Sequence, residues 1–322
     1  MNRRMALGAM AGVVALAGGI AAPAQAQETL TVVVSYPAGS PPDVVARVVT
    51  DRLADRLGRN IVVDARPGGA GNVGTNVVAQ SAPDGNTLLV TANGPAAVNQ
   101  ALFPDLPYDP ETDLDTVTLF VTAPMILVVD PSLPVEDMAG FIEYARENPG
   151  AMSYATTGVG SGVHLTMELL KQREGLDIEH IPYPGSAQAM TDLMGGTIQA
   201  MFAIASGALP FIEDDRVRAL AITSDERLAA APDIPTVGEQ GHPELVSSVW
   251  MGLFAPGGSD RAFLEEVHGH VAEILQDPEV VEIFGNSGYQ ISGIGLDDFR
   301  AFVGEETVKW TGVIEAAGIV LE

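Results

Sequence analysis

Apolar and polar positions along the chain change period repeatedly, and each change predicts a different element. Residues 30–36 (LTVVVSY) form a nearly continuous apolar run, which is typical of a strand buried on both faces. Residues 43–57 then place valine and leucine at helical spacing, and Gly58 follows as a helix stop. The next predicted elements are a strand at 61–63, a helix at 73–81 and a strand at 87–91.

The same alternation continues through the middle of the chain and predicts an α/β protein with a parallel sheet covered on both faces. Two long apolar segments, at 117–129 and 249–255, mark the passages between one α/β unit and a second. We therefore expect two lobes, the first built from the N-terminal stretch and the C-terminal helices. Ligands of such open sheets bind beyond the carboxyl ends of strands, opposite helix N-termini. The remaining predicted elements are helices at 135–147, 163–174, 187–194, 261–275 and 297–317, and strands at 152–156, 177–181, 198–204 and 217–223.

The first 26 residues predict an export signal. Arg3 and Arg4 give a short positive region, an uncharged apolar stretch follows, and Ala24-Gln25-Ala26 fits a signal-peptidase site. A membrane anchor is the alternative, but an anchor needs about 20 strongly apolar residues, and this stretch is rich in alanine and glycine. We therefore expect cleavage after Ala26 and a periplasmic product.

Charge and composition exclude several classes of partner. The 322 residues include 42 acidic and 16 basic side chains, so the formal net charge is −26. Nucleic-acid binding rests on Lys and Arg that neutralise phosphates, so we expect no nucleic-acid partner. Lys171 and Lys309 are the only lysines, so the sequence offers no polybasic segment for an anionic membrane. A sequence without cysteine has no disulfide, thiolate metal site or thiol nucleophile.

The loop after the first predicted strand, residues 36–43 (YPAGSPPD), can be interpreted as a helix start or as an anion-binding site. Ser40 fits the N-cap of the next helix and Asp43 the third position of a capping box, which is enough for a helix start. The loop also fits an anion site, because Gly39 admits a ligand close to the backbone and the helix dipole favours a carboxylate. The two prolines lack amide hydrogens, so donors would come from Ala38, Gly39, Ser40 or Asp43.

Three further glycine-rich loops precede predicted helices. Residues 69–74 (GAGNVG) fit G-x-G-x-x-G, but no acidic residue follows the next strand to hold a ribose, which favours an anion loop or a packing turn over a dinucleotide site. In residues 158–164 (GVGSGVH), Ser161 can donate to a ligand oxygen, and His164 lies in the first helical turn, where packing is the alternative role. The fourth loop is residues 183–186 (YPGS). Four such loops, each at a strand end, together indicate a cleft lined by backbone donors.

Catalytic constellations are missing from the sequence. It has no G-x-S-x-G elbow and no G-x-x-x-x-G-K phosphate loop. The acids at 109, 111, 113 and 115 alternate like a calcium loop, but Leu114 and Phe120 stand where an EF-hand requires Gly and Glu. We therefore expect no enzyme, no metal and no cofactor.

The segment YPAGSPPDVVAR resembles the first strand–loop–helix signature of the tripartite tricarboxylate transporter (TTT) substrate-binding proteins, the TctC or Bug receptors. The similarity covers essentially the whole chain after the predicted leader. Together with the motifs named next, this segment forms a set that is far more specific than any single glycine loop. The other motifs, in the family's order, are RPGGAGNVG, PDGNTLLV, LPYDPETDLDTV, YATTGVGSGVHL, IPYPGSAQAMTDLMGGTIQAMF, VRALAITSDER, PDIPTVGEQG and VWMGLFAP.

The resemblance implies a type II periplasmic-binding-protein (Venus flytrap) fold with a hinged ligand cleft. The expected first lobe comprises residues 27–125 and 253–322, and the second comprises residues 126–252. Such receptors capture a small carboxylate and deliver it to integral membrane TTT permease subunits. A di- or tricarboxylate, an acidic amino acid or an aromatic carboxylate is therefore the implied ligand of an expected monomer without a cofactor.

The resemblance also implies ligand contacts from both lobes, carried over motif by motif. Asp43 matches the signature aspartate, which we expect mainly to fix the loop. The other implied positions are Tyr36, Pro37, Ala38, Gly39, Ser40, Gly71 and Asn93 in the first lobe, and Thr157, Ser161, His164, Gly185, Ser186 and Ala203 in the second.

Three departures from the family pattern leave the ligand open. Ser40 replaces the usual second glycine of the first loop, so its hydroxyl can replace a water or donate to a second polar group. The usual GAGG motif reads Gly-Gly-Ala-Gly at 68–71, and Pro184 replaces a common lysine. The alternative function is a receptor of the same fold that presents its ligand to a sensor kinase. An exported hydrolase or oxidoreductase is disfavoured by the missing catalytic groups.

Overall fold

The computed structural model describes residues 29–321, so the predicted leader and its cleavage site lie outside the described residues. The first sheet begins with three parallel strands. β1 (Thr29–Val34) lies between β2 (Asn60–Ala65) and β3 (Thr87–Ala92). Helices α1 (Pro41–Leu57) and α2 (Asn72–Ala79) make the crossovers, as the residue pattern predicts.

Helix α1 shows how local sequence sets an element. Two prolines occupy its first turn, where backbone amides have no partner inside the helix. Val45, Val49 and Leu53 recur at four-residue spacing and are buried with the strands of the first sheet. Gly58 ends the helix with a φ of 60°, a left-handed conformation that glycine adopts without strain.

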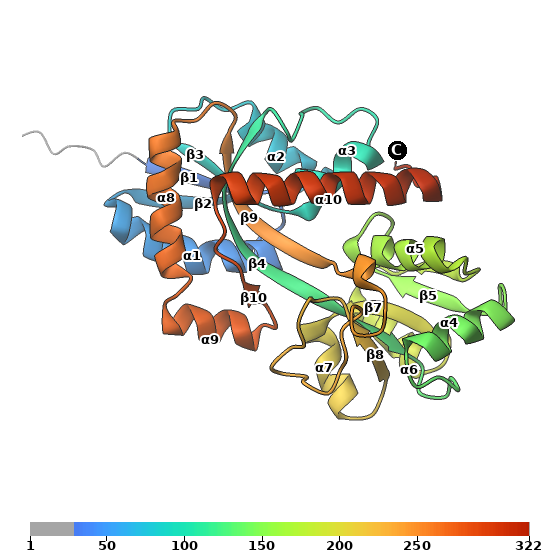
Figure 1. Cartoon of the computed structure of the whole chain (residues 1–322). Coiled ribbons are helices and arrows are strands. Elements are labelled where there is room, and N and C mark those ends of the chain that lie inside the picture. The colour runs from blue at the N-terminus through green and yellow to red at the C-terminus, as the bar shows by residue number, and fades with distance from the viewer. Residues whose placement is uncertain (1–28, 322) are drawn as a thin grey trace, which may run out of the picture.

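A second group of strands carries the middle of the chain. β5 (Ser153–Thr156) is parallel to both β6 (Glu179–Pro182) and β7 (Ala200–Ile204). Its helices are α4 (Met138–Glu147), α5 (Gly162–Glu174), α6 (Ser186–Met194) and α7 (Ala205–Glu213). We call the elements around β1 the first lobe and those around β7 the second lobe (Figure 1).

Two antiparallel strands, β4 (Leu114–Val129) and β9 (Ser248–Pro256), run side by side between the lobes (Figure 1). The first part of β4 pairs with β9 and with β10 (Gln290–Ile291). The last part of β4 pairs with β7 and β8 (Arg218–Ile222). The long β4 is therefore a covalent connection shared by both groups of strands.

The last helix, α10 (Leu296–Ala317), lies across the lobes and reaches α5 (Figure 1). Trp310 and Val313 of α10 belong to the same apolar cluster as Leu169 of α5. Gln172 Nε2 of α5 also donates to the Val313 carbonyl at 2.8 Å. The C-terminal half of α10 therefore packs on the second lobe, although the helix starts in the first.

The predicted parallel pairing is confirmed for β1, β2 and β3 and for β5, β6 and β7, but the strands that join the lobes pair antiparallel. β3–β9, β9–β4 and β4–β7 are antiparallel, so the ten-stranded sheet is mixed. Eight strands follow the order β2-β1-β3-β9-β4-β7-β5-β6, and β8 and β10 each pair with β4 outside this order. An apolar run predicts a buried strand but not its direction, so the pattern did not predict these antiparallel pairs. The elements that the pattern did not predict are η1 (Gly69–Gly71), η2 (Gly94–Val98), α3 (Asn99–Leu102), α7, η3 (Pro243–Leu245), α9 (Pro278–Asn286) and β10.

The predicted helix at 261–275 corresponds to α8 (Arg261–Ile274), which packs on the first sheet. Within residues 29–321, no helix combines the length and apolar character needed to cross a membrane.

Candidate functional site

The loop between β1 and α1 is held by Asp43 from inside the helix. The Gly39 amide donates to Asp43 Oδ2 at 2.9 Å, and Arg47 binds the same carboxylate through Nε and Nη2 at 2.9 and 3.0 Å. The Arg47 hydrogen bond, with help from the Gly39 amide, lowers the pKa of Asp43 although burial opposes the shift. Asp43 is therefore ionised and fixes the loop, which is the geometry that the predicted role requires.

Ser40 stands at the N-cap of α1 but does not cap it. Its backbone is extended, its amide donates to the Pro37 carbonyl at 3.0 Å, and its side chain makes no capping bond. Ser40 Oγ is buried and has no hydrogen-bond partner among the described residues. A buried hydroxyl without a partner costs free energy, so this atom is suited to receive a polar partner. Pro37, Ala38 and Gly39 of the same loop are exposed.

Gly71 brings a second loop against the first. Its φ is 93°, and a Cβ on it would lie 2.6 Å from Pro95 Cγ and 3.4 Å from Tyr36 Cζ. Only glycine fits this close approach. Tyr36 itself is half-buried, and burial raises the pKa of its phenol, so the ring enters the site neutral.

An amide–phenol network supports this loop and was missed by the sequence analysis. Asn72 Oδ1 accepts from Asn99 Nδ2 at 2.6 Å and from Tyr108 Oη at 3.0 Å. Asn99 Nδ2 also lies 3.3 Å from the Ala70 carbonyl. All three side chains are buried, and the bond from Asn99 to the Ala70 carbonyl anchors the 3₁₀ turn η1 (Gly69–Gly71) to this buried network. The GAGNVG motif thus includes a tight packing turn. Its asparagine, Asn72, was the feature of the sequence that could have indicated a hydrogen-bond network here.

The loops of the two lobes meet at Asn93. This buried residue follows β3, and a Cβ on Gly162 of the second lobe would lie 3.7 Å from its Nδ2. A Cβ on Gly160 would lie 2.5 Å from Leu102 Cδ1 of the first lobe. The glycines before α5 therefore let the second-lobe loop approach the first lobe closely.

The loop before α5 is closed by its own polar groups. Ser161 Oγ donates to the Gly158 carbonyl at 2.7 Å. The Gly160 amide donates to His164 Nδ1 at 3.1 Å. His164 is buried, and burial together with nearby His180 lowers its pKa to about 4. We therefore find His164 as a neutral side chain that shapes the loop.

Beneath this loop lies a stack of three rings that the sequence analysis did not anticipate. The His180 ring centroid lies 4.2 Å from that of His164 and 5.0 Å from that of Tyr154. His180 Nε2 is 2.6 Å from Thr156 Oγ1. The stack exists because Tyr154 of β5 and His180 of β6 are register partners, a relationship that spacing along one chain does not reveal.

A charged pair ends the stack. Tyr154 Oη donates to Glu168, and Lys171 Nζ binds the same carboxylate oxygen at 2.6 Å. Burial alone would raise the pKa of Glu168, but the hydrogen bonds from Lys171 and Tyr154 outweigh it and keep that pKa low. One of the two lysines is thus engaged inside the second lobe.

The remaining predicted positions are placed differently. Thr157 is exposed directly after β5, and Gly185 and Ser186 open α6, where Ser186 is exposed. Ala203 lies on β7 opposite Ile126, and its methyl group packs in an apolar cluster. No contact described above joins these four positions to the first-lobe loops.

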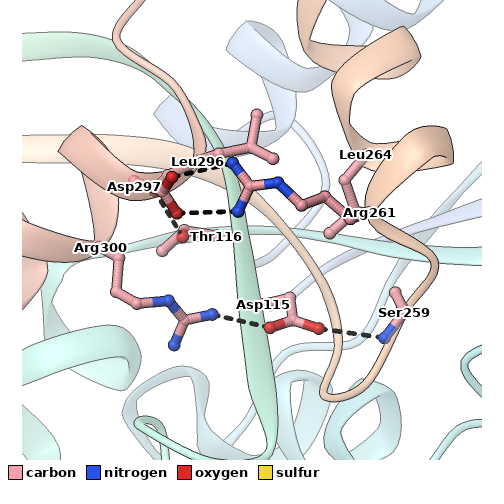
Figure 2. Close-up of a pocket in the computed structure, with 8 residues that line it drawn as sticks. All are labelled: Asp115, Thr116, Ser259, Arg261, Leu264, Leu296, Asp297 and Arg300. Atoms are coloured by element: carbon pink, nitrogen blue, oxygen red, sulfur yellow. Dashed lines mark hydrogen bonds and ion pairs between the residues drawn. The ribbon is translucent and has the colours of Figure 1, made fainter.

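A separate cavity of about 160 Å³ lies in the first lobe between the start of β4, α8 and α10. Figure 2 shows its arginines turned toward acids: Arg261 binds Asp297 through both terminal nitrogens, at 3.0 and 2.8 Å, and Arg300 binds Asp115 at 2.7 Å. Both arginines are paired, so the ion pairs around this cavity hold α8 to α10 and α10 to β4. It contains none of the predicted ligand positions.

Two α/β lobes joined by the antiparallel strands β4 and β9, with the loop before α5 lying against Asn93 and Leu102 of the first lobe, have the architecture of a periplasmic binding protein. The family profile "Tripartite tricarboxylate transporter family receptor" (TctC) matches residues 45–319. The chain belongs to this family of periplasmic solute receptors, as its sequence motifs predicted.

Related proteins agree over nearly the whole length. Protein BugT of Bordetella pertussis is 36% identical over 319 residues, covering 98% of each chain. The solved structure "R. palustris Rpa4515 with adipate" is 31% identical with a TM-score of 0.76, covering 91% of this chain and 98% of that one. MatC from Rhodopseudomonas palustris, solved with bound malate, is 30% identical with a TM-score of 0.71, covering 89% and 98%.

Proposed function

We propose that this chain is an exported receptor that binds a small carboxylate between its two lobes and delivers it to a TTT-type permease. The observation that carries the proposal is the buried Ser40 hydroxyl, which has no partner among the described residues and stands at the start of α1. Helix N-termini attract anions, and α5 of the second lobe starts where the loops of the two lobes meet.

The proposed site recognises charge through neutral donors. Arg47, the basic residue nearest the first loop in sequence, is bound to Asp43, and Lys171 is bound to Glu168. Hydrogen bonds from neutral donors to an ionised carboxylate are shorter and stronger than those between neutral groups. Closure of the lobes would exclude water and strengthen them further. The relatives solved with adipate and malate make dicarboxylates the first ligands to test.

The test is thermal unfolding of the exported form against a panel of carboxylates, after denaturation and refolding to remove carried-over ligand. A ligand at 100 times its dissociation constant adds about 2.7 kcal/mol to the free energy of unfolding. That gain raises the midpoint by several degrees for a chain of this size. A folded protein with no shift for any di- or tricarboxylate, acidic amino acid or aromatic carboxylate would refute the proposed ligand class.

Delivery to a permease needs a separate test in cells. We expect deletion of the gene to abolish uptake of the identified acid, and the wild-type gene to restore it. If the protein binds the acid in vitro but the deletion strain takes it up undiminished, delivery to a permease is refuted, and presentation of the ligand to a sensor kinase becomes the favoured role. The lobe boundaries, the periplasmic location and the monomeric state belong to the same proposal.

A further inference from the structure

A His–carboxylate cluster lies on the second lobe, away from the loops described above. Glu174 is the last residue of α5, and His242 and Glu244 lie at the start of η3. One ligand atom from each of the three side chains falls within 4.8 Å of the others. The cluster therefore joins two segments that are 68 or more positions apart in the sequence.

The distances in this cluster do not fit ordinary hydrogen bonds. His242 Nδ1 lies 3.4 Å from Glu174 Oε1 and 3.5 Å from Glu244 Oε1. An N–H···O bond is normally about 2.7–3.2 Å long, and one N–H points at one acceptor. Two ligands held at 2.0–2.2 Å by a tetrahedral Zn²⁺ lie about 3.3–3.6 Å apart. The separations of 3.4 and 3.5 Å therefore match the distance between two ligand atoms of one tetrahedral Zn²⁺ ion.

Charge at the cluster also favours a cation. Two carboxylates face one imidazole, and Glu174 closes the C-terminal end of α5, where the helix dipole disfavours an acid. Arg146 binds the other oxygen of Glu174, Oε2, which leaves Oε1 directed at His242. Arg146 offsets one of the two negative charges, and the negative charge that remains favours a bound cation.

The cluster is partly buried but open on one side. The side chains of Glu174 and His242 are each 17% exposed, and that of Glu244 is 33% exposed. Glu244 and Pro243 also line a groove of about 730 Å³ between η3, α5 and α10. The carboxylate of Glu244, the most exposed of the three, therefore lines the groove, and a water would complete the four ligands of a tetrahedral ion.

We propose that Glu174, His242 and Glu244 form a binding site for a divalent transition-metal ion, with Zn²⁺ as the best match. One imidazole nitrogen and two carboxylate oxygens are ligands that Zn²⁺ accepts, whereas Mg²⁺ and Ca²⁺ prefer oxygen alone. Bound metal would fasten η3 to the end of α5, beside the helix that spans both lobes. This site goes beyond the proposed carboxylate receptor and does not depend on it.

The test is titration of chelator-treated full-length exported protein with ZnCl₂, followed by calorimetry and by thermal unfolding. We expect one saturable site with a dissociation constant in the micromolar range or below, and a rise in the unfolding midpoint. MgCl₂ at the same concentration should produce neither effect. Equal responses to Zn²⁺ and Mg²⁺ would indicate diffuse binding to the acidic surface and would overturn the proposal.

Substitutions locate the site. His242→Ala and Glu244→Gln should each weaken Zn²⁺ binding at least tenfold, while His270→Ala, on α8 of the first lobe, should leave it unchanged. Circular dichroism without metal establishes whether each variant is folded. If His242→Ala does not fold, the conservative Glu244→Gln provides the test of Zn²⁺ binding. Unaltered Zn²⁺ affinity in the folded variants, or no binding by the wild type, would refute the metal site.

Discussion

The Gly160 amide donates a hydrogen bond to Nδ1 of His164, so the imidazole at the start of α5 fixes the loop that leads into its own helix. The acceptor must be an unprotonated nitrogen. The pKa of about 4 at His164, which burial and His180 produce, keeps it so at neutral pH. Loop shape and the protonation state of His164 are therefore coupled.

We predict that acidification destabilises the protein through His164. The pKa of this imidazole is 6.5 in an unfolded chain and about 4 in the folded protein, so the unfolded chain binds the additional proton between these values. The free energy of unfolding then falls as pH falls from about 6.5 to about 4, by about 3 kcal/mol in total. Urea unfolding at several pH values in this interval measures the slope.

The matched variant for this prediction is His164→Asn, which keeps an acceptor oxygen near the position of Nδ1 and does not titrate. Its stability should depend less steeply on pH. The slope that remains should reflect His180, whose pKa is also lowered by burial, and Glu168, whose pKa is held low by its hydrogen bonds. Identical slopes for wild type and variant would contradict the assignment.

We predict that Ser40→Ala weakens carboxylate binding without weakening the fold. Loss of one hydrogen bond to a charged ligand costs about 1.5–3 kcal/mol, or roughly ten- to a hundredfold in affinity. The free protein should be unchanged or slightly more stable, because the lost hydroxyl is buried without a partner among the described residues. Calorimetry with the identified acid gives the affinity. Ser81→Ala serves as the control, since that hydroxyl is bound to the Val77 carbonyl in α2; wild-type affinity in Ser40→Ala would exclude Ser40 from the site.

We predict that Gly71→Ala destabilises the fold by about 3 kcal/mol. The variant combines a positive φ with a contact of 2.6 Å to Pro95 Cγ. Gly58→Ala separates the two effects, because Gly58 also has a positive φ but a Cβ there meets nothing within 4 Å. The control should cost about 1 kcal/mol. Equal losses in the two denaturation curves would show that the approach of Pro95 contributes nothing.

We predict that Glu306→Leu costs about 2–4 kcal/mol, because it leaves two buried indole N–H groups without an acceptor. Trp250 Nε1 and Trp310 Nε1 both donate to Glu306 Oε2 at 2.9 Å. Glu306→Gln keeps an amide oxygen at this position and should lose clearly less. Chemical denaturation of both variants makes the comparison, and a Gln variant as unstable as the Leu variant would argue against a shared acceptor.

Local pattern predicted the elements that have a strong period and left out those that do not. The apolar spacing of α1 and the runs of β1 and β4 were sufficient, because burial of one stripe or both faces leaves a direct trace in sequence. Helix α7 was missed because it contains Pro210 and follows β7 without a break. The direction of β4 and β9 depends on which strands they pair with, and no local pattern encodes that.

The candidate site divides in the same way. The glycine-rich sequence predicted the loops that precede α1, α2, α5 and α6, and Asp43 was expected to fix the first of them. The pairing of Tyr154 with His180 depends on strand register. The amide–phenol network depends on contacts of Asn72 with Asn99, 27 positions away, and with Tyr108, 36 positions away. Such groups become neighbours only after the sheet has assembled.

The two tryptophans at Glu306 are the only ones in the chain, and they lie on β9 and α10, which both extend from one lobe toward the other. Intrinsic ultraviolet emission of the protein therefore comes almost entirely from the joint between the lobes. Any closing movement that shifts β9 against α10 would change the quenching of both indoles by the same carboxylate. Stopped-flow fluorescence without any added label therefore tests whether a carboxylate moves β9 against α10.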